Sequence, residues 1–196
     1  MLKAIIFDLN GIFLVSEMLS VRFERDFKVP IPEFLHGLNQ IMDQVRKPGA
    51  QPAFTYWKPY LDKWGIKLSE QEFWDYWFNA EKPSEEMLDL AKQIKAKGLK
   101  IFLLSNNFKE RAEYYGHYRW MSDVIDNAYY SWKTGFVKPD YKAWENLLRE
   151  NNLEPEDCMY FDDQEKNVKA AGEVGIKSYL FVDPNTTRNI IEHDSI

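Results

Sequence analysis

The chain has 196 residues, of which 45% are hydrophobic, and this length suffices for one full core or for one core with a small inserted domain. Its formal net charge of −6 argues against a nucleic-acid partner, because such partners usually require a basic surface. The single cysteine, Cys158, excludes an internal disulfide. No apolar run has transmembrane length or the form of a signal peptide, so we expect a cytoplasmic protein without a membrane partner.

The first apolar stretch, Ala4 to Phe7, runs into Asp8-Leu9-Asn10-Gly11 and is followed by a second apolar stretch, Ile12 to Val15. An Asn-Gly pair between two such stretches is typical of a β-hairpin. The same residues also fit a buried parallel strand that carries Asp8 to the carboxyl edge of a sheet, where open α/β sheets bind ligands. These residues alone leave both interpretations open.

Residues 16–83 have apolar side chains at helical spacing and contain four of the seven tryptophans. Helical segments are expected over Ile31 to Val45, around Trp57 and after Ser69, where Ser69 and Glu72 have the spacing of a capping box. The aromatic residues are interpreted mainly as core, with the alternative that some of Tyr56, Trp57, Trp74 and Trp77 line a substrate pocket. Arg46, like the other arginines of this block, could reach a substrate anion, but an exposed helical face is its expected position.

From Ser84 onward, short apolar strands alternate with helical segments. The expected strands are Lys100 to Leu104, Ala128 to Tyr130, Met159 to Phe161 and Ser178 to Val182. The expected helices run from Ser84 to near Gly98, from Lys109 to His117, from Pro139 onward and from Glu165 to Val174. This alternation is typical of an α/β fold with a Rossmann-like, doubly wound parallel sheet, and it favours Ala4 to Phe7 as a strand of that sheet. The predicted domains are an α/β core, residues 1–15 and 84–196, and a small α-helical cap, residues 16–83.

Polar side chains follow several of these strands. Asp8 ends the first, Ser105 and Asn106 the second, and Asp162 and Asp163 the strand that begins at Met159. Lys138 lies in a loop shaped by Gly135 and Pro139. Each has an ordinary structural interpretation, such as a helix cap or an exposed loop residue. Because parallel strands bring their carboxyl ends to one edge, we expect these groups to meet in one crevice.

The order of these motifs resembles the haloacid dehalogenase (HAD) superfamily. The resemblance rests on Phe7-Asp8-Leu9-Asn10-Gly11, Leu104-Ser105-Asn106, Lys138-Pro139, and Phe161-Asp162-Asp163 with Asn167. The helical insertion after the first strand is similar to the family's cap domain in that position. The later motifs are similar to small-phosphoester phosphatases, including bacterial glucose-1-phosphate phosphatases and the phosphatase domain of soluble epoxide hydrolase.

The resemblance implies a Mg²⁺-dependent phosphatase that acts on a small phosphorylated metabolite. Asp8 would attack phosphorus and form an aspartyl phosphate. The implied metal ligands are the Asp8 carboxylate, the Asn10 carbonyl and Asp163, with Asp162 close by. Lys138, Ser105 and Asn106 would hold the phosphoryl oxygens. A monomer or a homodimer is compatible with the sequence.

Asn10 departs from the family pattern, because phosphatases of this family usually have a second Asp at this position as general acid and base. An amide cannot transfer that proton, so we expect slow turnover. The alternatives are a non-catalytic or substrate-trapping binder of phosphorylated ligands and, less favoured, a 2-haloacid dehalogenase, which would need no metal.

Overall fold

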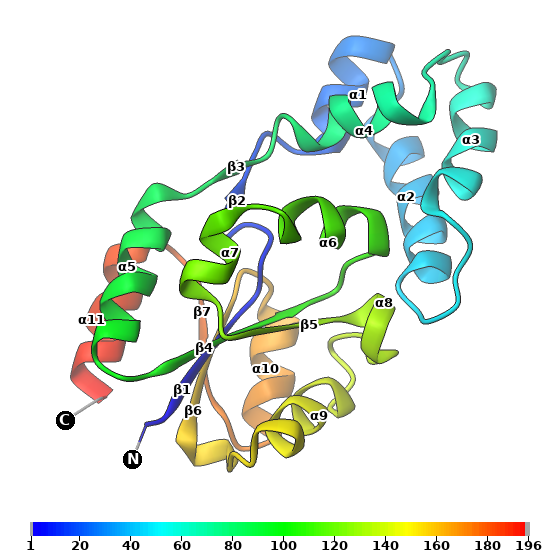
Figure 1. Cartoon of the computed structure of the whole chain (residues 1–196). Coiled ribbons are helices and arrows are strands. Elements are labelled where there is room, and N and C mark those ends of the chain that lie inside the picture. The colour runs from blue at the N-terminus through cyan, green and yellow to red at the C-terminus, as the bar shows by residue number, and fades with distance from the viewer. Residues whose placement is uncertain (1, 195–196) are drawn as a thin grey trace.

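The computed structural model describes residues 2–194, and its centre is a five-stranded sheet in the order β5-β4-β1-β6-β7 (Figure 1). All neighbouring strands in this sheet run parallel. The strands are β1 (Ala4–Phe7), β4 (Lys100–Ser105), β5 (Asn127–Tyr130), β6 (Cys158–Asp162) and β7 (Lys177–Leu180). The predicted parallel α/β fold is therefore confirmed.

Strand β1 lies in the middle of the sheet, where Ala4 is paired with both Lys100 and Cys158. The backbone N–H of Asp8 continues this ladder by donating to the Phe161 carbonyl at 3.0 Å. The hairpin interpretation is wrong, because the pairing partners of β1 are distant parallel strands. Gly11 still makes a tight turn, for which its φ of +79° is suited.

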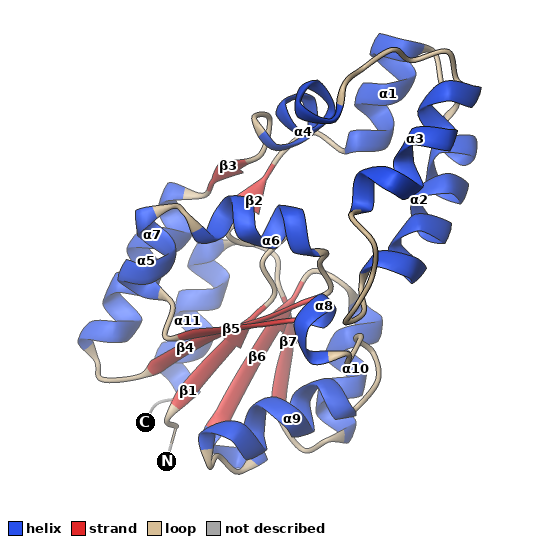
Figure 2. Cartoon of the chain, turned by 45° about the vertical axis from the view of Figure 1, so that its right-hand side comes forward, coloured by secondary structure: helices blue, strands red, loops and turns tan. Residues whose placement is uncertain are grey.

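Side chains alternate along the buried strands, so the sheet separates two apolar layers. Ile5 and Phe7 face α5 (Glu85–Ala96), α6 (Lys109–Gly116), α7 (Arg119–Val124) and α11 (Pro184–Asp194). Ala4 and Ile6 face the other layer, formed with α9 (Lys142–Asn151) and α10 (Glu165–Glu173). Figure 2 shows α9 and α10 on one side of the sheet and α5, α7 and α11 on the other. Both faces of β1 are therefore buried.

Four helices between β1 and α5 form a separate group, here called the four-helix group. They are α1 (Leu19–Phe27), α2 (Ile31–Val45), α3 (Ala53–Lys63) and α4 (Glu70–Phe78). Their own apolar core contains Phe23, Phe34, Trp57 and Phe73. The chain leaves and returns through an antiparallel pair of two-residue strands, β2 (Leu14–Val15) and β3 (Lys82–Pro83) (Figure 2). The predicted division into a core, residues 1–15 and 84–196, and a cap, residues 16–83, stays a prediction. Residues 1 and 195–196 of the predicted core lie outside the described residues.

The predicted helix starts agree with the structure in some places and not in others. Ser69 and Glu72 form the predicted reciprocal capping box at the start of α4. The prediction that Pro139 opens a helix is wrong, because α9 begins at Lys142, after a turn that starts with the cis Lys138–Pro139 peptide. Helices α7, α8 (Ser131–Thr134) and α11 and the short 3-10 turn η1 (Pro155–Asp157) were not predicted.

No helix within residues 2–194 combines the length and the apolar character needed to cross a bilayer.

Candidate active site

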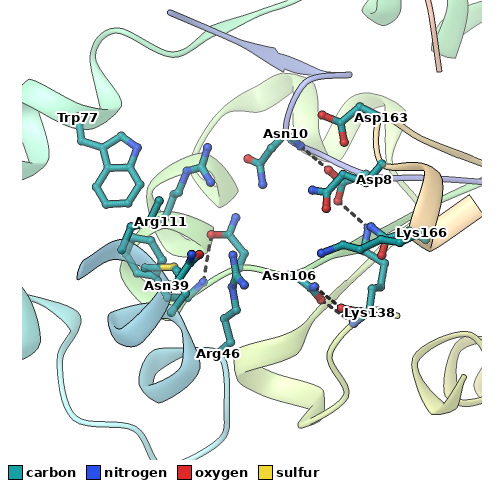
Figure 3. A pocket seen from close by; sticks show the side chains of 16 residues that line it. Asp8, Asn10, Asn39, Arg46, Trp77, Asn106, Arg111, Lys138, Asp163 and Lys166 are labelled. Carbon is teal, nitrogen blue, oxygen red and sulfur yellow. Dashed lines mark hydrogen bonds and ion pairs between the residues drawn. The ribbon is translucent and has the colours of Figure 1, made fainter. Parts of the chain in front are cut away.

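A pocket of about 300 Å³ lies where the carboxyl ends of the central strands face the four-helix group (Figure 3). Its floor comes from residues that follow β1, β4 and β6, and its opposite wall comes from α2 and α4. The sequence-predicted residues that line it are Asp8, Asn10, Asn106, Lys138 and Asp163. The predicted crevice at the carboxyl edge therefore exists, and it is closed on one side by helices from the insertion.

Asp8 lies on the pocket floor and is held at both carboxylate oxygens. Its Oδ1 accepts from Lys138 Nζ at 2.8 Å, and its Oδ2 accepts from the Asn10 backbone N–H at 3.0 Å. The residue is only 6% exposed. A buried carboxylate that is held at both oxygens, one of them by a cation, is fixed in position.

Lys138 is the central cation of the floor. Its Nζ also donates to Asp162 Oδ2 at 2.6 Å and to the Tyr160 hydroxyl at 3.0 Å. Its backbone is clamped by the Asn106 side chain, which donates to the Lys138 carbonyl and accepts from the Lys138 N–H, both at 2.8 Å. The side-chain amide of Asn106 is thus committed to placing Lys138.

The two consecutive aspartates have different environments. Asp162 is fully buried and accepts from Lys138, Tyr160, Gln164 N and Asn167. Burial disfavours its charged form, but the charge and hydrogen bond of Lys138, together with the hydrogen bonds from Tyr160 and Gln164 N, outweigh burial and lower the pKa of this carboxyl. Asp162 does not line the pocket. Its geometry is that of an anchor for Lys138.

Asp163 does line the pocket, beside Asp8 (Figure 3). Burial and the negative charges of Asp8 and Asp162 raise the pKa of Asp163 to about 6. Its Oδ2 lies so close to Gly11 that a Cβ at that glycine would be 2.6 Å away. Two neighbouring carboxylates that repel each other form a favourable place for a cation.

The oxygen groups on this floor fit Mg²⁺. Among residues 2–194 no three His, Cys, Asp or Glu side chains are clustered to hold a metal. Mg²⁺ does not need such a cluster, because it is commonly bound by one or two carboxylates together with water and substrate oxygens. Asp8 and Asp163, with the backbone carbonyl of Asn10, supply hard oxygen donors of this kind.

Asn10 and Ser105 are placed differently from each other. The Asn10 side chain points into the pocket, and its Oδ1 is buried without a hydrogen-bond partner in the described structure (Figure 3). Ser105 is 2% exposed, does not line the pocket, and its Oγ likewise has no partner within residues 2–194. Of these two predicted residues, only Asn10 presents a polar atom to the pocket.

Several groups that line the pocket or lie beneath its floor were missed in the sequence or placed elsewhere. Tyr160 could have been found, because it lies two residues before Asp162 on the same face of β6. Arg111 lies in the first turn of the helix that follows the Ser105-Asn106 motif. Arg46, expected on an exposed face, lines the pocket instead, and Phe108 was missed. Trp77, which the sequence offered as possible pocket lining, does line it. The approach of α2 and α4 to the pocket at the carboxyl edge of the sheet could not be read from either segment alone.

Comparisons with known proteins agree with this architecture. Residues 2–175 match the family described as haloacid dehalogenase-like hydrolase. The chain is 24% identical to sesquiterpene phosphatase astK of Aspergillus oryzae over 207 residues, which are 94% of this chain and 92% of that protein. It is 22% identical to bifunctional epoxide hydrolase 2 of Sus scrofa over 214 residues, 97% of this chain but only 38% of the relative's length.

A similar solved structure is a HAD family enzyme of Bacteroides thetaiotaomicron, described as a complex with magnesium and inorganic phosphate. It has a TM-score of 0.76 and 21% identity, and the likeness covers 92% of this chain and 94% of that one. At this level of identity the likeness establishes the fold.

Proposed function

The chain belongs to the haloacid dehalogenase-like hydrolase family, and from this premise we propose that it is a Mg²⁺-dependent phosphatase of small phosphorylated molecules. The observation that carries the proposal is the floor of the pocket, where the Asp8 carboxylate is held by Lys138 and lies beside Asp163. The name of the Aspergillus oryzae relative and the magnesium and phosphate of the Bacteroides structure support the same reaction class.

Asp8 is proposed as the nucleophile. One carboxylate oxygen attacks phosphorus and forms a phosphorus–oxygen bond, while the bond to the leaving oxygen breaks. Lys138 is placed to neutralise negative charge on the phosphoryl oxygens, since its Nζ is 2.8 Å from Asp8 Oδ1. Water then cleaves the aspartyl phosphate and releases phosphate, which regenerates the Asp8 carboxylate.

Asp8, Asp163 and the Asn10 carbonyl would hold Mg²⁺, which would supply positive charge to stabilise the transferring phosphoryl group. In this proposal Asp162 is not a direct ligand, because its oxygens already accept from Lys138, Tyr160 and Asn167. Its role is to position Lys138. Ser105, whose Oγ is buried away from the pocket, would contact a phosphoryl oxygen only after a local rearrangement.

Asn10 limits the reaction at the proton-transfer steps. Its unpartnered Oδ1 can accept a hydrogen bond from water, and its Nδ2–H can donate one to the leaving oxygen, but the amide cannot deliver or remove a proton. A substrate whose leaving oxygen is already weakly basic, such as an aryl phosphate, needs no such donor. We therefore propose slow turnover of alkyl phosphates and faster first-step transfer from aryl phosphates.

The test compares p-nitrophenyl phosphate with an alkyl phosphate, with and without Mg²⁺, in the native chain, Asp8→Asn and Asn10→Asp. We expect Mg²⁺-dependent release of nitrophenol that disappears in Asp8→Asn. Asn10→Asp should raise alkyl phosphate turnover by about 10²- to 10⁴-fold, the usual contribution of general acid–base catalysis. The aryl substrate should gain less in its first step.

A second candidate, a binder that holds phosphorylated ligands without turnover, is favoured by Asn10 alone. Mg²⁺-dependent phosphate binding with no turnover in either the native chain or Asn10→Asp would support the binder and contradict the phosphatase. Halide release from 2-chloropropionate in the presence of a chelator would instead support a dehalogenase.

A further inference from the structure

We infer that the preferred ligand carries a second anionic group, a carboxylate or a second phosphate, and that Arg46 binds it across the pocket from Asp8. This inference rests on the proposed function, because it takes the phosphoryl group to lie over Asp8. It adds a recognition element that comes from the four-helix group rather than from the sheet.

Arg46 is a half-buried cation that lacks a compensating charge. It follows the last turn of α2, lines the pocket, and its Nε is buried without a hydrogen-bond partner in the described structure. No carboxylate of residues 2–194 lies within ion-pair distance of its guanidinium group. Asp43 and Asp8 favour its charge from farther away, whereas burial and Arg111 lower its pKa. Burying a cation in this way is unfavourable unless a ligand supplies the missing anion.

The other buried cations of the pocket already have partners. Lys138 is paired with Asp8 and Asp162. Arg111 is held by Glu81, which accepts from its Nε at 3.0 Å and also from its Nη2. Glu81 is itself fixed by hydrogen bonds from Tyr115 and Trp77. The charge of Arg111 is therefore compensated. Its Nε and Nη2 are hydrogen-bonded to Glu81, which leaves Nη1 as the nitrogen that does not donate to this carboxylate.

The pocket separates these groups in space. Figure 3 shows Arg46 and Arg111 reaching into the pocket from one side. Lys138, Lys166, Asp8 and Asp163 lie on the opposite side. A ligand whose phosphoryl group lies at Asp8 would direct its other end toward these guanidinium groups. Arginine binds carboxylate and phosphate through paired N–H donors, so either anion satisfies Arg46.

The experiment measures binding by calorimetry in Mg²⁺ with phosphonates, whose carbon–phosphorus bond keeps turnover from interfering. Three ligands share an alkyl chain of two to five carbons: one ends in a methyl group, one in a carboxylate, and one in a second phosphonate. For at least one chain length, we expect a doubly anionic ligand to bind about 10- to 100-fold more tightly than the methyl-ended one, as expected for one charged hydrogen-bonded pair.

Arg46→Gln should bring this ratio close to one. Lys47→Gln is the matched control, since it removes the same charge from the next residue, which is exposed and contacts Gln44. It should keep the ratio. The carboxylate and bisphosphonate arms distinguish the two possible sources of the second anion.

Equal binding of the methyl-ended and doubly anionic ligands at every chain length would overturn the inference and leave the proposed phosphatase standing. A preference that survives Arg46→Gln, or that falls equally in Lys47→Gln, would also overturn it. If inorganic phosphate and all phosphonates fail to bind with Mg²⁺, the proposed function fails together with the inference.

Discussion

Tyr160 contacts both charged groups that lie beneath the nucleophile candidate. Its hydroxyl donates to Asp162 and accepts from Lys138 Nζ at 3.0 Å. Tyr160→Phe removes these bonds with little change in volume, so Lys138 loses one of its three partners. We expect about 1 kcal/mol lower stability and, because Lys138 is held less firmly, a kcat lowered by about 10-fold.

Tyr129→Phe is the control for this prediction. Tyr129 is similarly buried, but its hydroxyl accepts from Asn127 and Asn151, away from the pocket. Denaturant unfolding should show comparable losses in both variants, whereas kcat should fall only in Tyr160→Phe. Equal kcat values would contradict the positioning role of Tyr160.

The absence of a side chain at Gly11 leaves space for the Asp163 carboxylate. A Cβ at Gly11 would lie 2.6 Å from Asp163 Oδ2, and the φ of +79° is unfavourable for alanine. Gly11→Ala should therefore displace the Asp163 carboxylate and raise the Mg²⁺ concentration needed for half-maximal activity by about 10-fold. Magnesium titration of phosphatase activity measures this change.

Gly98→Ala separates the displacement of Asp163 from backbone strain. Gly98 has a φ of +81°, and its added Cβ would meet no atom within 4 Å. Both alanine variants should lose about 1 kcal/mol of stability, but the Mg²⁺ requirement should change only in Gly11→Ala. A shared change in both variants would mean that strain, not Asp163, controls metal binding.

Asp126 links three elements of the core. It lies just before β5, and its carboxylate contacts side-chain or backbone donors of α5 and β4. Its Oδ2 accepts from the Ile101 N–H at 2.9 Å, and Lys95 and Lys100 are each 3.1 Å from its carboxylate. Burial raises its pKa, but these partners outweigh burial and lower the pKa overall. The carboxylate form is therefore favoured by folding.

The lowered pKa of Asp126 makes the free energy of unfolding depend on pH. A lowered pKa in the folded state stabilises the protein above the unfolded pKa, and the contribution is lost as pH falls through the folded pKa. Asp126→Asn should cost about 1 kcal/mol at pH 7, and this difference should disappear in strongly acidic solution. Urea unfolding of both proteins across pH 7 to 3 tests it; a constant difference would contradict the prediction.

The sequence predicted the elements whose pattern is local. Apolar runs ending in polar residues correctly identified all five strands of the sheet, and Ser69 correctly marked a helix start. The two-residue strands β2 and β3 are too short to carry a periodic pattern. Pro139 failed as a helix start because the chain turns at Asp140 before α9 begins at Lys142.

The site was predicted as far as strand order determines it. Asp8, Lys138 and Asp163 come together because parallel strands end at one edge. The separate environments of Asp162 and Asp163 could not be predicted, since they depend on which way each side chain leaves the end of β6. Arg46 was placed on an exposed face because its approach to the pocket depends on where the four-helix group places α2 relative to the carboxyl edge of the sheet.

Phe108, which follows β4, connects the four-helix group to the α/β core. It is 1% exposed, and its ring centroid lies 5.4 Å from that of Trp77 and 5.8 Å from that of Trp74. Phe108→Leu should weaken this contact and expose the connecting segments around β2 and β3. We expect proteolytic cleavage there to accelerate by about 10-fold, corresponding to about 1.4 kcal/mol of closing free energy.

Phe102→Leu provides the control, because Phe102 is also buried but packs with Tyr129 on the far face of the sheet. Both variants should lose global stability, while faster cleavage at β2 and β3 should occur only in Phe108→Leu. Mass spectrometry of early proteolytic fragments identifies the cleaved segment. Identical fragment patterns in the two variants would show that the contact at Phe108 does not hold the four-helix group against the α/β core.

The central position of β1 has a consequence for synthesis on the ribosome. Ala4 is made well before its two neighbours in the sheet, because Lys100 and Cys158 lie 96 and 154 residues further along the chain. A nascent chain that ends after α5 holds Asp8, Asn10 and the complete four-helix group, but no parallel neighbour for β1. The pocket floor therefore assembles only after β6 has emerged, so that incomplete chains carry the nucleophile candidate without the lysine and carboxylates that surround it.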